Sequence, residues 1–168
     1  MAAMYDAIIL WIHILAAVAF IGPQLFLVAA VVPAMQTIED VKVRARATRV
    51  MSMRFGILGG GALVVVLITG MLNYIHEKDS IDTFQRYFIT LQIKLTMVAL
   101  VVILTILHGA VFGRRLQQLN ETNADVAEIA KARRLSMFAS IATMVLSIAI
   151  LFCAALLGSE WSVSGALR

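Results

Sequence analysis

Four apolar stretches, each about 20 residues or longer, constrain the fold of this chain more than any other feature. They cover roughly residues 7–34, 55–75, 87–113 and 135–158. A helix of about 20 apolar residues crosses the ~30 Å hydrocarbon core of a bilayer and satisfies its own backbone hydrogen bonds there. Of the 168 residues, 61% are hydrophobic and only 14% are charged, which is too little polar surface for a soluble domain. We therefore expect an all-α integral membrane protein.

The connections between these stretches are short, which makes neighbouring helices antiparallel. Residues 1–168 are accordingly predicted to form one transmembrane domain, a four-helix bundle with up-down-up-down topology. Gly22 and Pro23 predict a kink near the middle of the first span. Residues 123–134, in the third connection, have helical periodicity and are interpreted as a short helix on the membrane surface.

The charged residues predict the topology. The first and third connections carry five basic residues each, whereas the middle one has two basic residues offset by three acidic ones. The ten basic residues are Lys42, Arg44, Arg46, Arg49, Arg54, Arg114, Arg115, Lys131, Arg133 and Arg134. By the positive-inside rule these two connections are cytoplasmic and both termini lie on the extracytoplasmic side of a bacterial-type inner membrane. The formal net charge of +4 then reflects contact with lipid headgroups rather than with nucleic acid.

Small and polar residues inside the spans suggest helix contacts. Glycines open the second span and close the third, and a polar stripe follows the fourth; these residues are Gly56, Gly59, Gly60, Gly61, Gly109, Gly113, Ser136, Ser140, Thr143 and Ser147. Small residues let helices approach closely in lipid, and hydroxyls can hydrogen-bond between helices. The same surfaces could pack against a second copy or a larger membrane complex, and the glycine cluster could make room for a flat macrocycle.

Titratable side chains at membrane depth are costly and therefore mark candidate functional sites. His13 and Lys94 both lie about 10 Å from the outer surface at 1.5 Å per residue, so we expect them at one level. His108 lies ~21 Å further along the helix from Lys94, near the cytoplasmic end, and belongs to a separate site. His76 and Met71, on the outer half of the second span, could join the level of His13.

Two cofactors fit these residue types. Imidazole is the usual axial ligand of haem b in helical bundles, and small residues flank His13 on the stripe of Ala16, Ala17, Phe20 and Gln24. Copper is the alternative, with His13, His76 and His108 as candidate ligands beside methionine. Structural interpretations stay open for each residue. The Lys94 ammonium could reach the headgroups along its own stem, and His108 could hydrogen-bond Thr105 or water.

The residues around His13 and Lys94 also carry a family resemblance. The first span resembles that of CopD-type copper-resistance membrane proteins and the related HemJ-type protoporphyrinogen oxidases, with His13, Phe20 and Gly22 in the matching places. Lys94, Leu95, Arg114 and Arg115 resemble the Lys-Leu helix of the same superfamily with its basic end. Phe20 replaces the tryptophan that is usual there. The resemblance implies a haem b site that includes His13 and Lys94.

We accordingly expect an integral membrane protein that binds haem b at His13, with Lys94 as a second ligand or propionate partner, and in which His108 marks a second haem or a cytoplasmic proton route. It would act in electron transfer or as an oxidoreductase on a porphyrinogen or quinol substrate, although whether it is an enzyme is left open. A copper transport or resistance protein and a cofactor-free assembly subunit of a larger complex are the alternatives.

Overall fold

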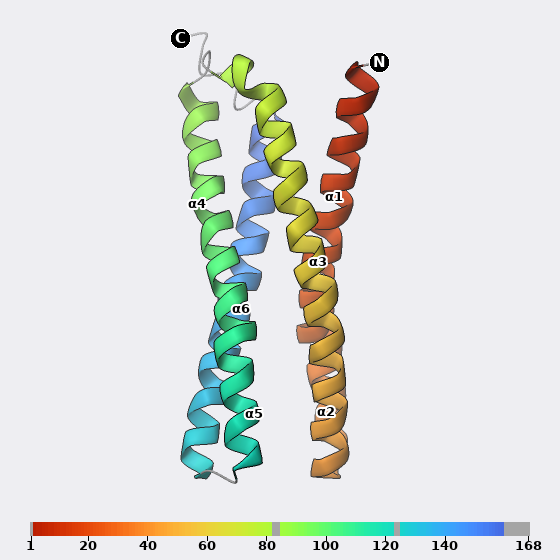
Figure 1. Cartoon of the computed structure of the whole chain (residues 1–168), viewed down its shortest axis with the longest axis vertical. Coiled ribbons are helices and arrows are strands. Elements are labelled where there is room, and N and C mark those ends of the chain that lie inside the picture. The colour runs from red at the N-terminus through yellow and green to blue at the C-terminus, as the bar shows by residue number, and fades with distance from the viewer. Residues whose placement is uncertain (1, 82–84, 123–124, 160–168) are drawn as a thin grey trace. The chain divides into compact units, whose positions relative to one another are not determined.

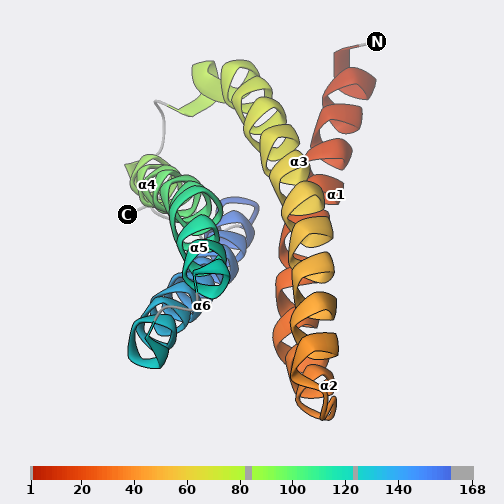
Figure 2. The same cartoon turned by 60° about the horizontal axis from the view of Figure 1, so that its bottom comes forward.

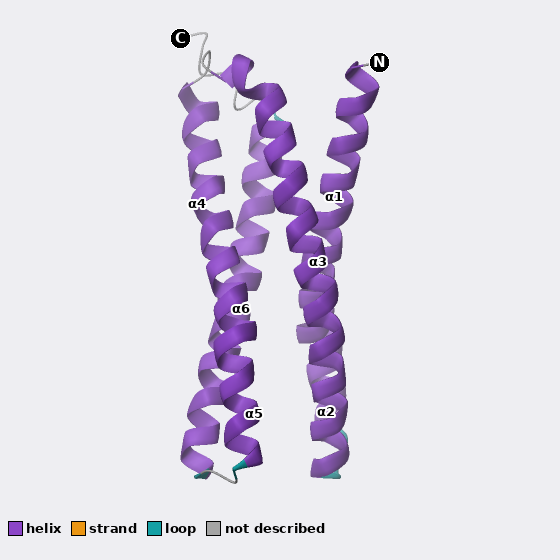
Figure 3. Cartoon of the chain, in the orientation of Figure 1, coloured by secondary structure: helices purple, strands orange, loops and turns teal. Residues whose placement is uncertain are grey.

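The computed structural model describes residues 2–81, 85–122 and 125–159, and every regular element among them is a helix (Figures 1 and 3). The elements are α1 (Ala2–Phe26), the π-helical turn η1 (Leu27–Val31), α2 (Val32–Gln36), α3 (Val41–Ile81), α4 (Gln85–Leu107), the π-helical turn η2 (His108–Gly113), α5 (Arg114–Glu121) and α6 (Val126–Leu157). The prediction of an all-α fold is confirmed for these residues.

In the described part of the chain, four helical segments are long and apolar enough to cross a membrane: Met4–Gln36, Lys42–Ile75, Tyr87–Leu116 and Val126–Leu157. Their lengths of 30 to 34 residues correspond to roughly 45–51 Å at 1.5 Å per residue. That exceeds the ~30 Å hydrocarbon core, so the helices extend beyond it. Large apolar side chains stand on the helix surfaces, with Trp11 63% and Ile57 70% exposed. Such surfaces suit contact with lipid, and the chain is a membrane protein by these criteria.

The helices form two compact units, Met1–Ser80 and Ile81–Arg168, each of which is described by itself. In the first unit, α1 and α3 run side by side (Figure 2). They are antiparallel, because His13 contacts Thr69 while Phe20, further along α1, approaches Gly59, which comes earlier in α3. In the second unit, α6 packs along α4, η2 and α5. The predicted antiparallel neighbours are therefore present within each unit.

The first connection is shorter than the sequence suggested. Since α3 begins at Val41, the basic residues from Lys42 to Arg54 lie on a helix rather than in a loop. Asp40 stabilises this start, because its Oδ1 accepts hydrogen bonds from the backbone N–H of Lys42 (2.8 Å) and Val43 (3.2 Å). The separate surface helix expected at residues 123–134 is likewise wrong. α6 begins at Val126, capped by Asp125, and continues without a break to Leu157.

The backbone has irregular turns after Phe26 and after Leu107. Pro23 sits inside α1, which continues to Phe26, and the π-turn η1 follows. The kink expected at Gly22 and Pro23 stays a prediction. A second π-turn, η2, starts at His108. A Cβ atom at Gly113 would stand 3.4 Å from the His108 carbonyl oxygen, which is an ordinary van der Waals distance.

Candidate cofactor site around His13

His13 is fixed by a hydrogen bond between α1 and α3. The imidazole is half-buried, and its Nδ1 lies 2.8 Å from the hydroxyl Oγ1 of Thr69, which is only 7% exposed. Because both residues lie within apolar, membrane-length helices, little water competes for this bond. The bond therefore orients the imidazole ring relative to α3.

The Thr69 hydroxyl also bears on which ring nitrogen carries the proton. Thr69 Oγ1 donates to the backbone carbonyl of Val65 at 2.7 Å, one turn earlier on α3. A hydroxyl has one proton to donate and two lone pairs to accept with. With its proton directed at Val65, the oxygen can accept from Nδ1–H, which is the arrangement that leaves the lone pair of a neutral imidazole on Nε2. Nε2 is one of the two nitrogens through which histidine binds a metal, and a hydrogen bond from the other nitrogen is the usual support.

Gly70, next to Thr69, lets the imidazole lie directly against α3. A Cβ atom at this position would be 3.2 Å from His13 Cε1 and 3.7 Å from Nδ1. None of the glycines singled out in the sequence makes so close an approach to another helix. Among the four glycines that open the second span, only Gly59 has an atom of another helix nearby, Phe20 Cδ2 at 3.9 Å.

The predicted stripe on α1 has a different role from the one expected. Ala16 and Phe20 are buried, and Ala16 lines a hollow shared with α3. These residues therefore form part of the α1–α3 contact and are not available as an open face for a porphyrin. A porphyrin bound to His13 would have to approach from outside this contact.

The depth estimate brought α3 to the level of His13, where Thr69 and Gly70 make the contacts with it. Met71, expected near His13, is two residues from Thr69 and therefore about 200° away around the helix. Its side chain is 59% exposed and points away from the α1–α3 contact. His76 lies on α3, but its side chain is outside the described residues, so its role as a metal ligand stays a prediction.

Lys94 lies on α4, in the second unit, and is half-buried. Its place beside His13 stays a prediction, because the two residues belong to different units.

His108 makes a looser contact of the same kind with α6. Its Nδ1 lies 3.5 Å from Ser140 Oγ, which itself donates to the Ser136 carbonyl at 3.1 Å. The backbone of Ser136 also interacts with the imidazole. Thr105, the partner considered from the sequence, does not fill that role, because its buried Oγ1 has no hydrogen-bond partner among the described residues. His108 is thus tied to α6 less tightly than His13 is to α3.

The two buried hydroxyls of the stripe on α6 bond within their own helix, whereas Ser140 of the same stripe contacts His108. Thr143 and Ser147 are buried, but each donates to a carbonyl of its own helix, Ala139 at 2.8 Å and Thr143 at 2.7 Å. Small side chains that satisfy themselves in this way allow close packing.

No group of three or more His, Cys, Asp or Glu that could hold a metal ion occurs in the described part of the chain. This finding lends no support to a multi-ligand copper centre there. A haem needs only one or two axial ligands, and an imidazole anchored through Nδ1, as that of His13 is, suits this role.

Comparison of the chain with family models, with curated proteins and with solved structures finds no match. The class of the protein therefore rests on its own geometry, which is that of an all-helical membrane protein with an anchored imidazole within the first span.

Proposed function

We propose that this protein binds haem b through His13 Nε2 and acts in electron transfer or as an oxidoreductase on a porphyrinogen or quinol substrate. The observation that carries the proposal is the hydrogen bond from His13 Nδ1 to Thr69. It anchors a titratable ring at membrane depth and supports the Nδ1–H tautomer that an axial ligand requires. The resemblance of the first and third spans to the CopD and HemJ superfamily supports the same cofactor.

Four further residues would each have a separate role in the proposed function. Thr69 would accept a hydrogen bond from His13 Nδ1–H and so prevent the ring from rotating. Gly70 provides the space in which the ring lies. Bound haem would supply the one-electron redox centre. Lys94, at the depth estimated for His13, is proposed as the second ligand or as the partner of a haem propionate. His108 is proposed to mark a second haem or a proton route at the end of the bundle where the basic residues lie.

The proposal also includes the assembly of the chain. The two units would pack into an up-down-up-down bundle in a bacterial-type inner membrane. The basic ends of α3 and α6 would face the cytoplasm and both termini the other side. Insertion of a reporter after residue 122 and after residue 81 would test this topology, since only the first insertion should report from the cytoplasm.

The test of the function is the absorption spectrum of the purified protein, oxidised and then reduced. Wild type should show a Soret band, His13→Ala should lose it, and Met71→Ala, on the same level of α3 but facing away, should keep it. A wild-type protein with no Soret band, isolated under conditions that retain haem in a control cytochrome, would contradict the proposal. Stoichiometric copper without a haem spectrum would favour the copper alternative instead.

A further inference from the structure

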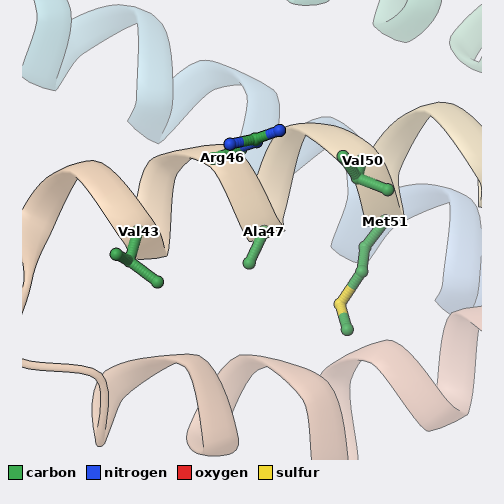
Figure 4. Close-up of a pocket in the computed structure, with 5 residues that line it drawn as sticks. All are labelled: Val43, Arg46, Ala47, Val50 and Met51. Carbon is green, nitrogen blue, oxygen red and sulfur yellow. The ribbon is translucent and has the colours of Figure 1, made fainter.

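Two apolar hollows lie on α3. The first, of about 400 Å³, is formed by the N-terminal turns of the helix, and Figure 4 shows its lining residues: Val43, Arg46, Ala47, Val50 and Met51. The second, of about 440 Å³, lies between α1 and α3 and is lined from α3 by Ile57, Leu58, Gly61, Ala62 and Val65. From α1 it is lined by Ile12, Leu15, Ala16 and Ala19.

Both hollows lie along one face of α3. Their lining residues recur every three or four positions, from Val43 through Val50 to Ile57 and Val65, which keeps them on one side of a helix. Arg54 falls in the same row, four residues after Val50 and three before Ile57. Arg54 therefore occupies a helix position between the two hollows, and Arg46 lines the outer one.

Between Asp40 and Glu77 the charged residues of this helix are all basic. No Asp or Glu occurs in the sequence between Asp40 and Glu77. The apolar stretch begins at Phe55, directly after Arg54, so Arg54 marks the edge of the hydrocarbon. The second hollow then extends from about 5 Å to about 17 Å below that edge at 1.5 Å per residue. It follows a path that a lipid acyl chain takes when its headgroup is level with Arg54.

We propose that this face of α3 is a binding site for an anionic phospholipid. One acyl chain occupies the second hollow, and the phosphate is bound by Arg54 and Arg46. Guanidinium groups bind phosphate oxygens in pairs, and an anionic headgroup complements a helix segment that carries only basic residues. Gly61 leaves room for the chain, since nothing lies within 4 Å of the place where its Cβ would be. The site is independent of any cofactor at His13.

The test is native mass spectrometry of the purified full chain exchanged into micelles with phosphatidylglycerol or phosphatidylcholine. Wild type should retain phosphatidylglycerol in preference. Arg54→Gln should weaken that retention about fivefold, because one basic residue at a membrane surface contributes about that factor. Gly61→Leu should fill the hollow and abolish retention. Gly60→Leu is the matched control, since Gly60 also has open space around it but does not line the hollow.

Circular dichroism would verify that both leucine variants remain helical. Equal retention of the two lipids by wild type would overturn the proposal, as would equal behaviour of Gly61→Leu and Gly60→Leu. Displacement of phosphatidylglycerol by a quinone at this site would overturn it as well.

Discussion

The hydrogen bond between His13 and Thr69 makes a quantitative prediction about Thr69→Val. Valine keeps the shape of the side chain but removes the oxygen that lies 2.8 Å from His13 Nδ1. An unsatisfied buried donor costs about 1–3 kcal/mol, whereas interhelical hydrogen bonds in membrane proteins average only about 0.6 and reach about 1.7 kcal/mol. Because Thr69 is buried and His13 is half-exposed, we expect a loss of about 1 kcal/mol in the free energy of unfolding. Thr69→Ser keeps the hydroxyl and should recover most of it.

The assay is equilibrium unfolding in mixed micelles, analysed as a double-mutant cycle with His13→Ala. The cycle cancels the energetic cost of the cavity that His13→Ala leaves. It should give a coupling energy of about 0.6–1.7 kcal/mol between His13 and Thr69. The looser pair His108 and Ser140, at 3.5 Å, serves as the comparison and should give less than about 0.5 kcal/mol. A coupling near zero for His13 and Thr69, or a larger one for His108 and Ser140, would refute the reasoning.

Three further predictions use the same unfolding measurement. Gly56→Ala, with open space around it, should gain about 0.5–1 kcal/mol. Gly70→Ala should lower the free energy of unfolding, because its Cβ would press on His13 Cε1. Equal effects of the two substitutions would contradict the contact between Gly70 and His13. Ser147→Leu, at 2% exposure, should destabilise by about 1–3 kcal/mol through overpacking, while Ile148→Leu on the exposed side should change stability by less than about 0.5 kcal/mol. Asp40→Ala should cost about 1 kcal/mol by removing the cap of α3, and Asp40→Asn should keep most of that stability; a neutral Asp40→Ala would show that the cap contributes nothing.

Much of the fold could be predicted because a membrane-length apolar helix can be recognised from local composition alone. The four spans were found in this way. Their ends were not, since Lys42 to Arg54 reads as a basic connection although its spacing suits a helix that extends past the hydrocarbon. Hydropathy reports where a helix meets water, not where its backbone hydrogen bonds stop. The π-turns after Phe26 and Leu107 likewise leave no signal that the spacing of apolar residues could reveal.

The site was half predictable for a related reason. Counting residues from the membrane surface gives depth, and it brought His13 close to the level of Met71. Depth says nothing about rotation, and it is rotation that turns Thr69 and Gly70 toward His13 and Met71 away. A threonine directly followed by a glycine, at the depth of a histidine on the preceding span, is the signal that could have located the partner.

The most direct test of the haem proposal is the reduced-minus-oxidised absorption spectrum of wild type beside His13→Ala and Thr69→Ser. We predict haem b bands in wild type and in Thr69→Ser, and their loss in His13→Ala. Undiminished haem in His13→Ala, or no haem in wild type where a control cytochrome keeps its own, would contradict the assignment of His13 as the ligand.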